Sequence, residues 1–126
     1  MGFVRFTQTG RSFAPKVSIW SRGQIGFNNG AVTRFELDKF DYVVFMFDKE
    51  EQKIGLLFTT NKAEDGAVKL NKRTAGISVG AKSFLDYCGI DYSTTKQYEL
   101  THDKDAGEAG LYIINLADGK AGKEEN

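Results

Sequence analysis

The chain has 126 residues, 40% of them hydrophobic, and its 17 basic and 17 acidic side chains cancel to a net charge of zero. This composition can fill a hydrophobic core, which argues against wholesale disorder, and the length fits a single domain over residues 1–126. One cysteine excludes an internal disulfide framework, no apolar run reaches membrane-spanning length, and residues 1–10 lack a secretory pattern. We therefore expect a cytoplasmic protein with no membrane partner.

The chain begins with two expected strands after a strand or ordered arm over residues 1–14. Residues 16–20 alternate between apolar and polar side chains, with Val17 and Trp20 on opposite sides, which predicts a half-buried strand. Residues 21–23 predict a basic bend or bulge, after which the strand resumes at 24–27.

A short helix and a hairpin follow in the chain. Asn28 and Asn29 are suited to capping a helix, and the apolar spacing after them predicts a helix over 31–35. Residues 42–47 form a strongly apolar run, and a polar turn separates them from a second run over 54–58. This pattern predicts an antiparallel hairpin.

The second half of the chain repeats this order after a polar linker at 61–66. We expect strands at 67–70 and 77–79 separated by a basic turn at 71–73, a helix over 80–87, a second hairpin from 96–101 and 111–116, and a flexible tail over 117–126.

The two halves therefore look like two copies of one strand–helix–hairpin unit, residues 15–60 and 67–116. Each unit alone leaves an apolar face open, and the other unit can cover it. The sequence predicts an α+β fold, mainly antiparallel β with two short helices, in which the units pack as an internal pseudo-dimer. The chain is then a monomer, although a homodimer is also compatible with the pattern.

The first unit resembles the AbrB/MazE swapped-hairpin family of transition-state regulators and antitoxins. The family spacing of a glycine, apolar residues, a short helix and a polar loop is matched by Gly23, Ile25, Phe27, Phe35, Leu37 and Asp41. Asn28 stands where the family has proline, and Phe40 stands where it has glycine. In the second unit Ile77 and Val79 fit, while Gly80 takes the proline position.

The resemblance implies a small intracellular DNA-binding protein that regulates transcription. Family members contact DNA through basic residues on the first strand and its flanking loops. By position, the residues that would contact phosphates here are Lys16, Arg22, Arg34, Lys72, Arg73 and Lys82. Ser18, Asn28 and Asn29 would add neutral donors.

Two other interpretations of the same residues stay open. Trp20, flanked by Lys16 and Arg22, could stack on an unpaired base, and residues 73–85 resemble part of the PC4-type fold that binds single-stranded nucleic acid. Alternatively, Trp20 closes a second core face. The chain could also be a protein–protein interaction module that docks a protein partner with its aromatic strands and the edge at 3–7.

An enzyme is not expected. His102 lies beside Asp103 and Asp105, but their spacing does not complete a calcium loop, and a structural turn explains them. Cys88 is not expected to be a nucleophile, because the only histidine, His102, lies in this turn and no second one exists to activate the thiol. The sequence has no P-loop, dinucleotide fingerprint or zinc pair, so we expect no cofactor and no metal.

Overall fold

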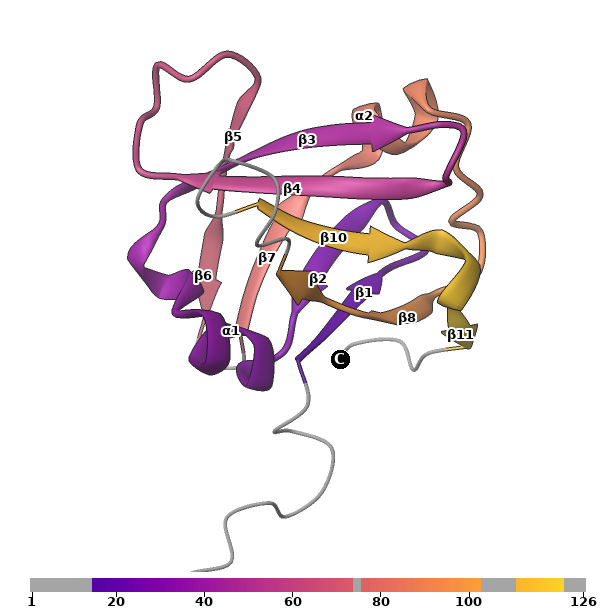
Figure 1. The fold of residues 1–126 in the computed structure, drawn as a ribbon, viewed down its shortest axis with the longest axis horizontal. Helices are drawn as coiled ribbons and strands as arrows, with labels where there is room; N and C mark the ends of the chain where they lie inside the picture. Colours follow the sequence, from indigo (N-terminus) through magenta and orange to yellow (C-terminus); the bar gives the residue numbers. More distant parts are fainter. Residues whose placement is uncertain (1–14, 74–75, 103–110, 122–126) are drawn as a thin grey trace, which may run out of the picture.

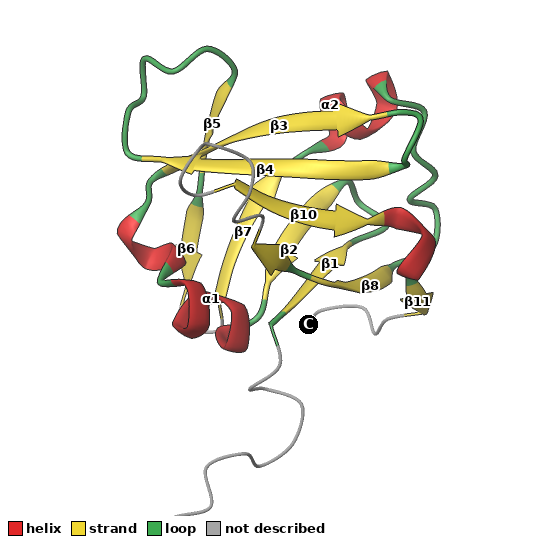
Figure 2. Cartoon of the chain, in the orientation of Figure 1, coloured by secondary structure: helices red, strands yellow, loops and turns green. Residues whose placement is uncertain are grey.

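The computed structural model of the protein describes residues 15–73, 76–102 and 111–121. Within these residues the chain forms two antiparallel β-sheets and two short α-helices, so the predicted, mainly antiparallel α+β fold is confirmed. The sheets lie one over the other, and the strands of one run across those of the other (Figures 1 and 2). The expected arm at 1–14 lies outside the described residues.

The first sheet has six strands within the described part of the chain. In order of hydrogen-bonded neighbours they are β11 (Lys120–Ala121), β8 (Lys96–Glu99), β1 (Lys16–Ile19), β2 (Gln24–Phe27), β7 (Gly76–Gly80) and β6 (Asn71–Arg73). β1 and β2 pair antiparallel, so residues 21–23, expected as a bend or bulge within a resuming strand, form the turn of a hairpin. β2 then pairs with β7, which places Gly26 opposite Ser78 and joins the two halves of the chain.

The second sheet has five strands within the described residues. They are β5 (Ala67–Lys69), β3 (Tyr42–Asp48), β4 (Lys53–Thr59), β10 (Leu111–Asn115) and β9 (Thr101–His102). The β3–β4 hairpin lies where the sequence predicts it, and Asp48 Oδ1 holds its turn by accepting from Glu51 N at 3.0 Å. On its other side β4 pairs with β10, with Gly55 opposite Ile113.

Two short helices link strands: α1 (Asn29–Phe35) connects β2 of the six-stranded sheet to β3 of the five-stranded sheet, and α2 (Lys82–Tyr87) connects β7 to β8 within the six-stranded sheet. α1 begins after Asn28, whose side-chain oxygen accepts from Ala31 N at 2.8 Å and so caps the first turn. It ends at Glu36, which adopts a left-handed conformation with φ of 53°. A 3₁₀ turn, η2 (Leu37–Lys39), follows. α2 lies beside β3 and is followed by Gly89, which also has a positive φ.

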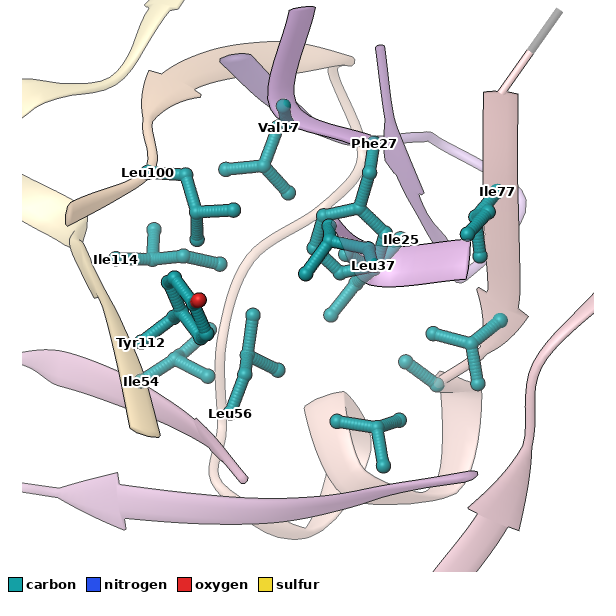
Figure 3. Close-up of a cluster of buried hydrophobic side chains, with 14 of the residues drawn as sticks. Val17, Ile25, Phe27, Leu37, Ile54, Leu56, Ile77, Leu100, Tyr112 and Ile114 are labelled. Atoms are coloured by element: carbon teal, nitrogen blue, oxygen red, sulfur yellow. The ribbon is translucent and has the colours of Figure 1, made fainter. Parts of the chain in front are cut away.

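The hydrophobic core lies between the two sheets. Alternate residues of the strands point inward, and Figure 3 shows side chains from both sheets meeting there. The largest side chains with less than 2% exposure include Ile25, Leu37, Leu56, Leu85 and Ile114. Because these residues come from both halves of the chain, the two halves share one core. Neither described helix has the length or hydrophobicity to cross a membrane.

The second predicted hairpin differs from the prediction, because its first strand divides between the sheets. β8 pairs with β1 in the six-stranded sheet, whereas β9 pairs with β10 in the five-stranded sheet. The change occurs at Leu100, which is 3% exposed and whose N–H donates to Pro15 O at 3.3 Å. Leu100 is thus buried at the point where the chain passes from one sheet to the other. The acidic turn at 103–110 lies outside the described residues.

Three further segments differ from the sequence expectation. Residues 71–73, expected as a turn, form the edge strand β6, where exposed polar and basic side chains are common. β5 pairs with β3 and so lies with the first half of the chain. The start of the expected tail is ordered by pairing, since β11 pairs with β8 after the short turn η3 (Leu116–Asp118). Residues 122–126 lie outside the described residues.

Candidate functional site

A groove of about 550 Å³ lies on the outer face of the six-stranded sheet, opposite the core. Its floor follows one row across the sheet, in which Gln97 is opposite Ser18, Ser18 opposite Gly26, and Gly26 opposite Ser78. The strands that carry this row are labelled in Figure 1. The described residues that line it are Ser18, Trp20, Arg22, Gln24, Gly26, Phe27, Asn28, Arg73, Gly76, Ile77, Ser78 and Gln97.

Small side chains make this part of the sheet a recess. Side chains normally stand perpendicular to a sheet and cover it. Here three neighbouring strands, β1, β2 and β7, present serine, glycine and serine in one row, so little covers the backbone. The inward neighbours of these residues, including Val17 and Val79, are fully buried in the core.

Trp20 forms one wall of the groove. Its backbone N–H donates to Gln24 O at 2.8 Å, so it directly extends the β1–β2 pairing. The six-membered part of its indole lies against Gly26, where any Cβ would overlap with the ring. The indole Nε1 is buried and has no hydrogen-bond partner among the described residues. The sequence placed Trp20 on the outward side of its strand, and the structure confirms that side.

Arg22 covers the indole of Trp20. Its Cζ lies 5.2 Å from the ring centroid, a distance at which a guanidinium is attracted to the face of an aromatic ring. Its Nε donates to Gln24 Oε1 at 3.1 Å. The side chain is exposed, and these two contacts hold it over the groove without an ion pair to a described carboxylate.

The turn that carries Arg22 is fixed from both sides. Ser21 N donates to the hydroxyl of Thr95 at 3.0 Å, and Thr95 is only 4% exposed. Gly23 has φ of +84°, and a Cβ there would come within 2.8 Å of Lys82 Cβ, so only glycine fits between the turn and α2. Gly23 O also accepts from Ala81 N at 2.9 Å. The turn is therefore tied to two segments of the second half.

Arg73 lies at the opposite end of the groove. It is directly opposite Gly76 on β7, and Gly76 in turn lies against the carbonyl oxygen of Phe27 with φ of +144°. The pairing of β2 with β7 runs from Gln24 at the Arg22 end to Phe27 at the Arg73 end. The three residue steps from Gln24 to Phe27 correspond to about 10 Å along the strand.

The other four cations that the sequence nominated do not line the groove. Lys16 lies on the same face but pairs with Glu99 at 4.0 Å, and Lys72 donates to Asp41 at 3.1 Å. Lys82 donates to the Tyr92 hydroxyl at 3.1 Å and lies 3.6 Å from a carboxylate oxygen of Asp86. The hydrogen bond to Tyr92, followed by the charge of Asp86, raises the pKa of Lys82. Arg34 lies in the last turn of α1.

The groove is locally positive although the chain is neutral overall. Among the described residues that line it, two are arginines and none is an aspartate or glutamate. The remaining polar lining residues are serine, glutamine and asparagine side chains, which can donate hydrogen bonds. Nowhere in the described residues do three histidine, cysteine, aspartate or glutamate side chains gather as a metal site would need.

Sequence reasoning missed Ser78, Gly76 and Gln97 as groove residues. Ser78 and Gln97 share the signal that marked Trp20, because they are polar residues at outward positions of alternating strands. Their alignment with Ser18 depends on pairings between strands more than fifty residues apart, which alternation alone does not reveal. The sequence signal that could have indicated the groove is the occurrence of small residues at outward positions of several strands.

A scan against protein-family models, a search of curated proteins and a search of solved structures each found no match to this chain. The function is therefore inferred from the residues of the groove. The groove brings together two guanidinium groups, several neutral hydrogen-bond donors and an indole.

Proposed function

We propose that the protein binds DNA through the groove on the six-stranded sheet, with Arg22 and Arg73 contacting phosphates. The observation that carries this proposal is the charge of the groove. Arginine offers a planar fork of donors that fits phosphate oxygens, and both arginines face the groove without an acid among its described lining residues.

The distribution of ion pairs supports this choice among the six nominated cations. Lys16, Lys72 and Lys82 each have a carboxylate within 4.0 Å, whereas no ion pair within the described residues involves Arg22, Arg73 or Arg34. Of these three arginines, Arg34 lies on α1 and does not line the groove. A cation already paired must lose that interaction before it binds a phosphate. Arg22 and Arg73 have no such competitor among the described residues, and both line the groove.

The neutral donors of the floor would act between the two phosphate contacts. Ser18, Ser78 and Gln97 lie in one row, so their hydroxyl and amide groups face the same ligand. Such groups contact both phosphate oxygens and base edges in protein–DNA complexes. The arginines would position the strand, and the hydroxyl and amide groups of the floor would contact it between the two phosphates.

The arrangement of the two halves supports an internal pseudo-dimer as part of this proposal. β2 pairs with β7 and β4 pairs with β10, and each of β2 and β7 is followed by a short helix. In such an arrangement the two halves build one groove across the β2–β7 pair, with Arg22 from the first half and Arg73 from the second. We place this protein in the cytoplasm as a small DNA-binding regulator, in keeping with its single cysteine and its resemblance to swapped-hairpin regulators.

Fluorescence polarisation of labelled single- and double-stranded oligonucleotides across a salt series tests this function. Removing both groove cations, Arg22→Ala with Arg73→Ala, should weaken binding roughly tenfold or more, since hydrogen bonds to charged groups contribute about 1.5–3 kcal/mol each. It should also flatten the slope of log K against log salt by about 1.5, as expected for two lost phosphate contacts.

The matched control is Lys72→Ala with Lys82→Ala, which removes the same net charge from outside the groove. This variant should bind within about threefold of the wild type. Equal losses in the two double variants would contradict the groove as the site. Absence of binding to either oligonucleotide at low salt would contradict the function itself.

A further inference from the structure

We propose that the groove takes a single strand of nucleic acid, and that Trp20 stacks on one of its bases once Arg22 has moved from the indole to a phosphate. This inference rests on the proposed function and specifies the ligand of the same groove. It depends on three observations: the shape of the site, the cover over Trp20 and the unpartnered indole N–H.

The shape of the site favours a thin ligand. Reading a duplex requires an element that protrudes into its major or minor groove, such as a helix or a β-ribbon. Here the cationic surface is a recess whose floor is Ser18, Gly26 and Ser78. A volume of about 550 Å³ holds a short stretch of one strand with its bases turned toward the protein. Open sheet faces with aromatic residues bind single strands in this way.

The cover over Trp20 is built from a side chain that a phosphate would attract. One side of the ring is occupied by Gly26, and the guanidinium of Arg22 lies over the ring at 5.2 Å. The contact between an exposed arginine and an aromatic ring is weak, whereas a charge-assisted hydrogen bond to phosphate is considerably stronger. Moving Arg22 onto a phosphate therefore exposes the indole where a base of the same strand can reach it.

The indole N–H supplies a second reason for a ligand here. Trp20 Nε1 is buried, and no residue in the described part of the chain accepts a hydrogen bond from it. Buried donors are almost always paired, and an unpaired one is costly. When neighbouring side chains move to admit a strand, an oxygen or ring nitrogen of a nucleotide can accept from this N–H. Binding would then satisfy a group that the free protein leaves unsatisfied.

The test uses the intrinsic fluorescence of the full chain, in which Trp20 is the only tryptophan. We expect oligo(dT) to quench this emission and to bind at least tenfold more tightly than a duplex of the same length. A single strand carrying abasic sites keeps the phosphates and removes the bases. It should bind at least fivefold more weakly than oligo(dT) and produce little quenching.

Variants separate stacking from folding. Trp20→Ala should weaken oligo(dT) binding by roughly 5- to 150-fold, and Trp20→Phe should retain most of the affinity because a phenyl ring still stacks. Polarisation measures both variants, and circular dichroism checks that they fold. If the duplex binds as tightly as oligo(dT), or if oligo(dT) binds without changing the emission, the inference is wrong while the DNA-binding function stands. Absence of any binding would instead reject the function.

Discussion

The indole of Trp20 lies against Gly26, so the wall of the groove rests directly on its floor. A Cβ at position 26 would overlap with three atoms of the six-membered ring. Trp20 can therefore occupy this position only because the residue beneath it is glycine. Glycine is unfavourable in a strand interior, where it usually marks a close approach of another group, and here that group is the indole.

Replacing Gly26 with alanine should displace Trp20 and open the groove wall. We expect Gly26→Ala to lower the free energy of unfolding by about 1–3 kcal/mol, as overpacking does, and to change the tryptophan emission of the free protein. Urea denaturation and fluorescence measure both effects. Gly80→Ala is the matched control, because nothing lies within 4 Å of a Cβ there and the strand conformation accepts alanine. If the two variants behave alike, the Trp20–Gly26 contact does not shape the groove.

The local elements of the first half could be predicted from the sequence because their signals are local. The alternation in residues 16–20 separates Val17 from Trp20, and the structure places them on opposite faces. Asn28 marks the start of α1 by its ability to cap, and its side chain does so. Such patterns depend on the period of a strand or the chemistry of one helix end, both of which are contained in a few consecutive residues.

The composition of the groove could not be predicted in the same way. Lys72 and Arg73 are adjacent and equally basic, yet Lys72 is opposite Ile77 on the core side of β7 and Arg73 is opposite Gly76 on the groove side. An expected turn at 71–73 gives no reason to separate them, whereas strand β6 does. The division of β8 from β9 at Leu100 is likewise set by where a buried side chain must lie between two sheets. The separation of Lys72 from Arg73 and the division of β8 from β9 therefore both depend on how the strands pair in the folded sheets.

Removing the cap at Asn28 should affect two elements together. Its Oδ1 accepts from Ala31 N at 2.8 Å at the start of α1 and from Lys16 N at 3.1 Å at the start of β1. We expect Asn28→Ala to lower the free energy of unfolding by about 1–2 kcal/mol, as measured by urea denaturation.

Asn28→Asp provides a control that separates stability from binding. It keeps an acceptor for both N–H groups, so its stability should remain close to that of the wild type. Because Asn28 lines the groove, the added negative charge should nevertheless weaken oligonucleotide binding several-fold, measured by polarisation. Unchanged affinity in a well-folded Asn28→Asp protein would argue against a ligand at this end of the groove.

The hydroxyl of Thr95 should be needed to hold Arg22 in position. It accepts from Ser21 N at 3.0 Å, and Thr95 is buried, so Thr95→Val removes this acceptor without a large change of volume. We expect a loss of about 1–2 kcal/mol in the free energy of unfolding and a several-fold weaker affinity for oligonucleotide. Thr95→Ser keeps the hydroxyl and should restore both quantities. A valine variant that is destabilised but binds normally would show that the turn does not position Arg22.

Alkaline pH should destabilise the protein through Tyr98. Burial raises the pKa of the Tyr98 hydroxyl above its ordinary value of about 10, because the ionised form is poorly solvated between β8 and the core. The unfolded chain therefore loses this proton at lower pH than the native protein does. Above pH of about 10 the unfolded state binds fewer protons, so the free energy of unfolding falls as pH rises through the raised native value. Below pH of about 9 the Tyr98 hydroxyl is protonated in both states, so its contribution to the free energy of unfolding is fully present and constant.

Tyr98→Phe isolates this effect, since phenylalanine keeps the ring against Gly119 and removes the ionisable group. Urea midpoints measured at pH 8, 10 and 11 should fall less steeply in Tyr98→Phe than in the wild type. Burial also raises the pKa of Tyr112, with a smaller contribution from the charge of Glu36, so part of the slope should persist in the single variant. Tyr87, whose side chain is 91% exposed, gives the control for removing a hydroxyl from the surface. A pH profile of Tyr98→Phe that overlays the wild type would show that ionisation of Tyr98 does not contribute to the alkaline loss of stability.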